Sequence, residues 1–304
     1  MLQRRTLLAA AALAAPALGT SRGAMAQEVT LRLHHFLPAV SNVHRHFLVP
    51  WTNKIREESG GRLRIQIFPS MQLGGAPPQL YDQAKDGVAD TVWTLPGYTP
   101  GRVPRIEVIE LPFIAHRRAS VNARVAWTLF DKHMRGTEFS ETHIITAWAH
   151  DGGQIHARRD VKTMEDLRGL KLRFPTRQAG EGLKALGATA IGMPVPQVPE
   201  AMSQGVIDGA VVPWEVVPSI RLQEMARYHI AIPGSPTFYS ASFILAMNPA
   251  RYQGLPADLK AVLDANSGEA AAIQAARVWD EEGPKVEEVA RRRGNSISEI
   301  TEAE

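Results

Sequence analysis

Short apolar segments of strand length alternate along the chain with segments whose apolar residues recur at helical spacing. The first kind predicts strands at 29–36, 62–68, 88–93, 143–148, 170–174 and 242–247. The second kind, marked by proline in a first turn or glycine after a last residue, predicts helices at 50–59, 77–86, 120–134, 180–186, 199–204 and 258–280. Strands that alternate with helices predict a mainly parallel sheet built of βαβ units.

One short pattern occurs twice, 118 positions apart. Residues 83–90 and 201–208 each combine a helix end, a glycine stop, Val-x-Asp and a following apolar segment. The same turn in each half of the chain predicts two similar lobes with a ligand cleft at their junction. A helix of about 20 residues spans about 30 Å, so the one at 258–280 can bridge the lobes. We assign 27–151 with about 239–278 to lobe I, and about 152–238 with 279–304 to lobe II.

The N-terminal segment 1–26 has the pattern of a signal peptide. Arg4 and Arg5 precede an apolar run at 7–18, and Ala24-Met25-Ala26 resembles a cleavage site. The run is too short to span a bilayer, which predicts export to the periplasm without membrane insertion. The paired arginines also resemble a twin-arginine signal.

Composition narrows the function further. The segment 1–26 carries three of the 34 basic residues and none of the 31 acidic ones, so the rest of the chain is electrically balanced. A balanced chain with only short basic runs does not attract nucleic acid. The chain has no cysteine, which excludes disulfides, a catalytic thiol and cysteine-based zinc sites.

Arg173 is the strongest candidate for a binding residue. It lies near the end of the predicted strand 170–174, which Pro175 terminates because proline cannot donate to a strand ladder. Open α/β sheets hold their ligands at the carboxyl ends of strands. A guanidinium there can bind a carboxylate with two parallel hydrogen bonds. We therefore predict that Arg173 binds a carboxylate ligand, against the alternative of a solvated or structural ion pair.

Several motifs resemble the periplasmic solute receptors of TRAP (tripartite ATP-independent periplasmic) transporters, the DctP family. They occur in the family's order at 69–75, 87–90, 110–113, 166–175, 204–209 with Pro213, and 255–259. The resemblance implies an α/β fold of two lobes, with a mixed sheet in each lobe and helices bridging them. It also implies a receptor, without enzymatic activity or cofactor, that delivers a small organic acid to the small and large permease subunits. In that family the arginine at the position of Arg173 pairs with the ligand carboxylate.

Two departures from the family pattern bear on the ligand. Sialic-acid receptors of the family have a second arginine where this chain has Gly153, and Val212 replaces a polar contact before Pro213. Both differences remove polar anchors. The predicted ligand is therefore a small monocarboxylate with an apolar or aromatic body. Candidate ligand-binding residues near strand ends and at the lobe crossing, besides Arg173, are Trp93, Trp214, Trp148, Tyr98, Phe174, His35, His34, Glu215 and Phe238.

Other functions remain as alternatives. The histidines at 34, 35, 44 and 46, with His150-Asp151, suggest a zinc-dependent periplasmic hydrolase, although the chain has no His-Glu-x-x-His run. The receptor of an ATP-driven importer would use the same cleft. A cation held by Glu215 is a further possibility, although one acid does not make a metal site. The sequence leaves open which of His34 and His35 faces the cleft, which acid binds, and the oligomeric state. It also leaves open whether the C-terminus is truncated.

Overall fold

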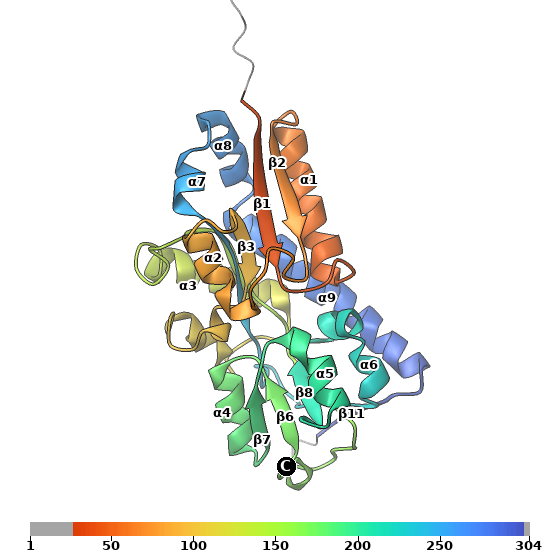
Figure 1. Ribbon diagram of the computed structural model, residues 1–304. Coiled ribbons are helices and arrows are strands. Elements are labelled where there is room, and N and C mark those ends of the chain that lie inside the picture. Colours follow the sequence, from red (N-terminus) through yellow and green to blue (C-terminus); the bar gives the residue numbers. More distant parts are fainter. Residues whose placement is uncertain (1–26, 301–304) are drawn as a thin grey trace, which may run out of the picture.

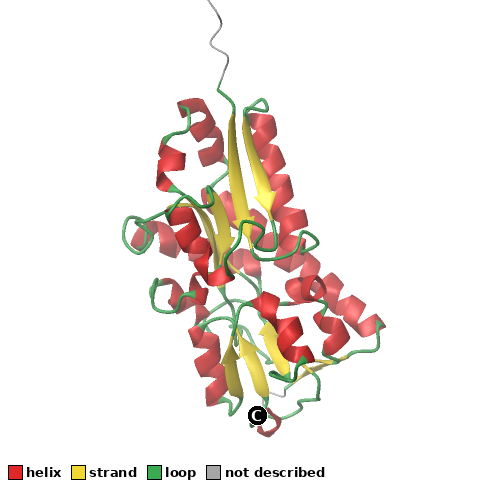
Figure 2. Cartoon of the chain, in the orientation of Figure 1, coloured by secondary structure: helices red, strands yellow, loops and turns green. Residues whose placement is uncertain are grey.

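The computed structural model describes residues 27–300, so the predicted signal peptide at 1–26 lies outside the described residues. Two mixed β-sheets with helices packed on them form two lobes, which lie one above the other in Figure 1. Figure 2 shows the sheets as two separate groups of strands, joined by loops and by one long helix. Within the described part of the chain, every helix falls short of the length and apolarity that crossing a membrane requires.

The first lobe contains a five-stranded sheet in the order β2-β1-β3-β10-β4. Its strands are β1 (Val29–His35), β2 (Leu63–Phe68), β3 (Thr91–Thr94), β4 (His143–Ala149) and β10 (Ser242–Met247). The neighbours β1, β2 and β3 are parallel, whereas β10 runs antiparallel to β3 and β4. The helices of this lobe are α1 (Val49–Glu58), α2 (Leu80–Lys85), α3 (Ala119–His133), α7 (Pro249–Gln253) and α8 (Ala257–Ala265).

The second lobe contains a six-stranded sheet in the order β11-β9-β5-β8-β6-β7. Its strands are β5 (Gln154–Ala157), β6 (Lys171–Phe174), β7 (Thr189–Gly192), β8 (Gly209–Val212), β9 (Tyr228–Ala231) and β11 (Ser296–Glu299). Here β6 is parallel to β7 and β8, and β5 is antiparallel to β8 and β9. The short helices are α4 (Arg177–Ala185), α5 (Val198–Ser203) and α6 (Leu222–Met225).

Two backbone segments and helix α9 (Gly268–Arg292) connect the lobes. The β4–β5 segment and the β9–β10 segment run beside each other, since the Gly153 N–H donates to the Tyr239 carbonyl at 3.0 Å. Helix α9 packs on α3 and β4 of the first lobe and on the 3₁₀ helix Trp214–Ile220 of the second. We propose that the chain crosses between the lobes near Asp151 and near Tyr239.

The repeated Gly-Val-x-Asp turn has the same structural role in each lobe. Gly87 and Gly205 both adopt positive φ, 78° and 71°, which favours glycine. The Asp90 carboxylate accepts the Arg32 N–H of β1 at 2.7 Å, and the Asp208 carboxylate accepts the Lys171 N–H of β6 at 2.9 Å. In each sheet the acid therefore joins the start of one strand to the neighbouring parallel strand, β3 to β1 and β8 to β6.

The structure corrects three sequence predictions. The helix expected at 258–280 is two helices, because the chain breaks at Asn266 and Gly268 continues with φ of 75°. The alternation of strands and helices alone predicted a mainly parallel sheet, but both sheets are mixed, because β10 and β5 run against their neighbours; the mixed sheets implied by the family resemblance are confirmed. The strand expected at 88–93 begins only at Thr91, because the preceding residues form the Asp90 turn.

Candidate functional site

A narrow cavity lies between the two sheets, beside the carboxyl ends of β3, β6 and β8. The carboxyl ends of parallel strands are where open α/β sheets place their ligands. The cavity has a volume of about 30 Å³, so a ligand with a ring must move the lining side chains or the lobes apart to enter. Its lining is mostly apolar and aromatic, which strengthens the electrostatic interactions of the few polar groups in it.

Arg173 brings a buried positive charge to this cavity. Its side chain is only 1% exposed; Nε donates to the Met193 carbonyl at 2.8 Å and Nη1 to the Val211 carbonyl at 3.1 Å. Nη2 is buried and has no hydrogen-bond partner among residues 27–300. Burial lowers the pKa of Arg173, but a guanidinium stays charged at neutral pH. The unused Nη2 therefore offers a charged donor to an anion.

Two tyrosines approach this guanidinium, Tyr98 from the segment after β3 and Tyr239 from the segment between β9 and β10. Burial raises the pKa of both Tyr98 and Tyr239, which keeps their hydroxyls neutral and able to donate. Tyr98 Oη accepts the Val195 N–H at 3.1 Å across the cleft. A Cβ at Gly153 would lie 2.2 Å from Tyr239 Cδ1, so the Tyr239 ring occupies the space of a side chain at position 153.

Aromatic rings form the opposite wall. Phe243 of β10 lies at its centre, 5.7 Å from Trp93 and 5.2 Å from Trp279 between ring centroids. Trp148 stacks on Trp93 at 6.5 Å and backs this wall from the core of the first lobe. The Trp93 and Trp279 rings are tilted by 38° and 33° against the Phe243 ring, and the three form a continuous apolar surface on which an aromatic ring can pack.

Glu215 is the one acidic side chain lining the cavity. It is 2% exposed, and its Oε1 accepts the Val43 N–H of the first lobe at 3.2 Å. Burial, with smaller effects of Asp151 and Glu282, raises the pKa of Glu215 to about 8. Glu215 is therefore mainly protonated at neutral pH, and Arg173 is the only fixed charge that residues 27–300 contribute to the lining.

The comparisons with known proteins identify the family. The model of the bacterial extracellular solute-binding proteins, family 7 (DctP), matches residues 33–304. The chain belongs to this family. It is 44% identical to a TRAP solute-binding protein from Rhodoferax ferrireducens T118 solved with copurified benzoate, covering 90% of this chain and 84% of that one, with a TM-score of 0.87.

Two further solved structures are similar. One is a marine metagenome TRAP solute-binding protein specific for aromatic acid ligands, solved in complex with 3-hydroxybenzoate. The chain is 40% identical to it with a TM-score of 0.88, and the match covers 90% of this chain and 86% of that one. A Bordetella bronchiseptica TRAP periplasmic protein with bound (R)- and (S)-mandelate is 28% identical with a TM-score of 0.84, at the same coverage. DctP-family proteins are extracytoplasmic solute receptors and not enzymes, so the predicted receptor function is confirmed over the hydrolase alternative.

In this DctP-family protein the residues named from the sequence divide into two groups. Four line the cavity: Arg173, Trp93, Tyr98 and Glu215. The other six lie outside the lining: Trp148, Trp214, Phe174, Phe238, His34 and His35.

These six residues pack elsewhere. Trp214 packs against the rings of His156 and His229, behind β8. Phe174 lies on the other face of β6 from Arg173, where a Cβ at Gly180 would come within 2.8 Å of its ring. Phe238 packs against Phe113 at 5.8 Å.

The histidines proposed for zinc are engaged in other contacts. His34 Nδ1 lies 2.6 Å from Gln83 Oε1, and His35 Nε2 lies 2.9 Å from His44 Nδ1. Neither His34 nor His35 lines the cavity; the His35 ring lies behind Trp93, at 5.5 Å. Across residues 27–300, no group of three or more His, Asp or Glu side chains is placed to hold a metal ion.

Sequence reasoning missed several lining residues, chiefly Phe36, His150, Phe243 and Trp279. Trp279 lies near the middle of the alanine-rich helix α9, and a lone large ring in such a helix is the only signal for it. Phe243 lies in a fully buried strand, where a ligand-facing ring has the same pattern as a core ring. His150 was considered only as a zinc ligand.

The raised pKa of Glu215 predicts how stability changes with pH. Between its ordinary pKa of 4.5 and about 8, the unfolded chain loses this proton while the folded protein keeps it. Stability from this group is therefore fully present below pH 4.5 and is lost as pH rises toward 8, by at most about 1.4 kcal/mol per pH unit. Glu215→Gln keeps the acceptor for Val43 and removes the titration.

Urea denaturation at pH 5, 6, 7 and 8 measures this effect. We expect the free energy of unfolding of Glu215→Gln to increase relative to that of the wild type with each step to higher pH. The exposed Glu181, paired with Lys184 in α4, provides the control, and Glu181→Gln should keep a constant difference from the wild type. Parallel pH profiles for wild type and Glu215→Gln would show that Glu215 is ionised in the folded protein.

Proposed function

We propose that the cleft binds a compact aromatic monocarboxylate, with the carboxylate on Arg173 and the ring against Trp93, Phe243 and Trp279. The observation that carries this proposal is the unpartnered Nη2 of Arg173, buried beside an apolar cavity. A buried charge without a partner is costly, so an anionic ligand makes the closed arrangement of the lobes favourable.

The charges of the lining favour a monoanion. Arg173 carries one positive charge, while protonated Glu215 and the two tyrosines are neutral at pH 7. A dicarboxylate would bring a second negative charge without a partner into a mostly apolar cavity. The two solved relatives at 40–44% identity, with benzoate and 3-hydroxybenzoate bound, support the same ligand class.

The proposal extends to transport. With the signal peptide expected at 1–26, the mature protein captures its ligand in the periplasm and delivers it to the small and large membrane subunits of a TRAP permease. Closure of the lobes around the ligand gives the permease a ligand-dependent shape to recognise. Polar contacts join the lobes across the cleft, since Arg177 Nη2 and Gln178 Nε2 lie 2.6 and 2.7 Å from Glu107 Oε2.

Calorimetry and thermal denaturation with benzoate and benzamide test the proposal. The two molecules have nearly the same shape, but only benzoate carries a charge. Because a ligand that binds only the folded state raises the melting temperature, benzoate should raise it and benzamide should not. We expect the dissociation constant of benzamide to be about 100-fold larger or more. Binding of glucuronate or a dicarboxylate without binding of benzoate would contradict the proposed ligand class.

A further inference from the structure

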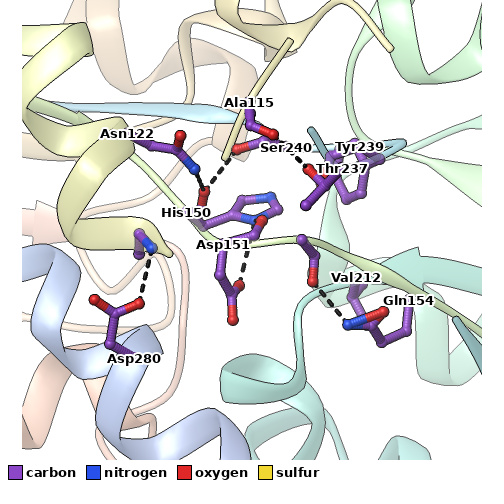
Figure 3. Close-up of polar contacts among 12 residues, drawn as sticks. Ala115, Asn122, His150, Asp151, Gln154, Val212, Thr237, Tyr239, Ser240 and Asp280 are labelled. Carbon is purple, nitrogen blue, oxygen red and sulfur yellow. Dashed lines mark hydrogen bonds and ion pairs between the residues drawn. The ribbon is translucent and has the colours of Figure 1, made fainter. Parts of the chain in front are cut away.

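His150 lies at the point where the first lobe ends and the crossing to the second begins. Its backbone is fixed on both sides, as Figure 3 shows: its carbonyl accepts from Asn122 Nδ2 at 2.7 Å and from Ser240 Oγ at 2.8 Å. Its N–H donates to the Ala241 carbonyl at 3.2 Å. The side chain is fully buried and lines the same cavity as Arg173. The imidazole is therefore held in one place beside the ligand site.

In the neutral imidazole, the hydrogen bond made by one ring nitrogen determines whether the other nitrogen donates or accepts. Nδ1 lies 2.5 Å from the Asp151 carbonyl oxygen, which can only accept, so Nδ1 carries the proton. In the neutral ring Nε2 then presents a lone pair. Nε2 is buried and has no hydrogen-bond partner among residues 27–300. An acceptor left unpaired in a buried site favours a ligand that supplies a donor.

Neighbouring rings hold the imidazole and narrow the kind of donor. Tyr239 packs against it at 4.9 Å, edge to face, and Phe243 lies at 6.0 Å. The indole N–H groups of Trp93 and Trp279, which line the same cavity, are also buried without partners in the described chain. A hydroxyl group can donate to an imidazole and accept from an indole, whereas an ammonium group cannot accept and would be repelled by Arg173.

We propose that His150 Nε2 accepts a hydrogen bond from a hydroxyl group of the bound acid, so that the receptor selects hydroxylated aromatic acids over unsubstituted ones. This inference rests on the proposed function. Arg173 binds the carboxylate that all such acids share, and His150 distinguishes among them. His150 is thus a specificity-determining residue in contact with the ligand, at the crossing between the lobes.

Calorimetry with benzoate and with the 2-, 3- and 4-hydroxybenzoates tests the inference, with each hydroxy compound compared to its fluoro analogue. Fluorine has nearly the size of a hydroxyl group but cannot donate. We expect at least one hydroxybenzoate to bind the wild type about tenfold tighter than its fluoro analogue. In His150→Phe that preference should disappear, so that each hydroxybenzoate and its fluoro analogue bind with the same affinity. His143→Phe, at the far end of β4 where the ring stacks on Tyr252, should retain the preference.

The outcomes separate this inference from the proposed function. Binding of benzoate with no hydroxyl preference in the wild type would overturn the role of His150 and leave the proposed function intact. A preference that persists in His150→Phe would assign the hydroxyl group to another residue. Failure of every acid to bind would overturn both proposals. The ligand series on the wild type gives a result even where His150→Phe does not fold, and melting temperatures of the variants identify that case.

Discussion

Replacing Arg173 with glutamine is expected to abolish benzoate binding in the concentration range where the wild type saturates. Among residues 27–300, the substitution removes the one arginine or lysine of the cavity lining and its unpartnered Nη2, which we propose to contact the carboxylate. Truncation of one partner in a buried charged pair costs about 2–5 kcal/mol, which weakens affinity about 30-fold to several thousand-fold. Arg173→Lys keeps the positive charge but loses the planar guanidinium, so its benzoate affinity should lie between those of the wild type and Arg173→Gln.

The same arginine also holds two backbone carbonyls, so its structural role needs a separate measurement. Arg173 donates to the Met193 and Val211 carbonyls from two separate nitrogens, Nε and Nη1, and the shorter glutamine has a single amide nitrogen that does not reproduce this geometry. Thermal denaturation of the ligand-free variants measures that loss. Arg168→Gln is the matched control, because Arg168 lies just before β6 in the same lobe but is exposed and paired with Glu165 at 2.8 Å. Wild-type calorimetric affinity in a folded Arg173→Gln protein would refute the assigned role.

A methyl group at Gly97 is expected to hold the lobes apart. Gly97 lies in the 3₁₀ helix Pro96–Tyr98 of the first lobe, and Thr176 follows β6 in the second. A Cβ at position 97 would lie 2.5 Å from Thr176 Cγ2 and 3.1 Å from its Cβ. Overpacking of this kind costs about 1–3 kcal/mol, which in the closed state corresponds to a roughly 5- to 150-fold loss of ligand affinity.

Calorimetry and small-angle X-ray scattering check this prediction together. Benzoate should compact the wild type and should compact Gly97→Ala less at the same saturation. The double variant Gly97→Ala with Thr176→Ala removes the nearer of the two contacting atoms, so it should regain part of the affinity. A single variant that binds and compacts like the wild type would show that the lobes do not approach at Gly97 when ligand is bound.

The sequence predicted most of the long elements and the strand that carries Arg173. The reason is local: the alternation in 170–174 and the stop at Pro175 specify a strand without reference to distant residues, and β6 is found at Lys171–Phe174. The Gly-Val-x-Asp repeat was equally readable, because its glycines need positive φ and its acids serve the adjacent strand. Strands β7 and β9 were not predicted; β7 lies at the edge of its sheet with every residue exposed or half-buried, so it has no run of buried apolar positions.

The rest of the site depends on contacts between distant segments. Trp279 and Phe243 reach the cavity from α9 and β10, and nothing in their neighbours along the chain distinguishes a ligand wall from a core. One distinction was available in the sequence: successive residues of a strand face opposite sides, so Arg173 and Phe174 cannot both face the cavity. The filling of the Gly153 site by Tyr239, 86 positions later, could be learned only from the fold.

The most direct test of the proposed binding mode is a crystal structure of the protein with benzoate bound. The proposed mode requires a carboxylate oxygen about 2.7–2.9 Å from Arg173 Nη2, the length of a charge-assisted hydrogen bond. It also places the benzoate ring between Arg173 and the wall formed by Trp93, Phe243 and Trp279. A benzoate whose carboxylate contacts other groups, with Arg173 Nη2 still unpartnered, would contradict it.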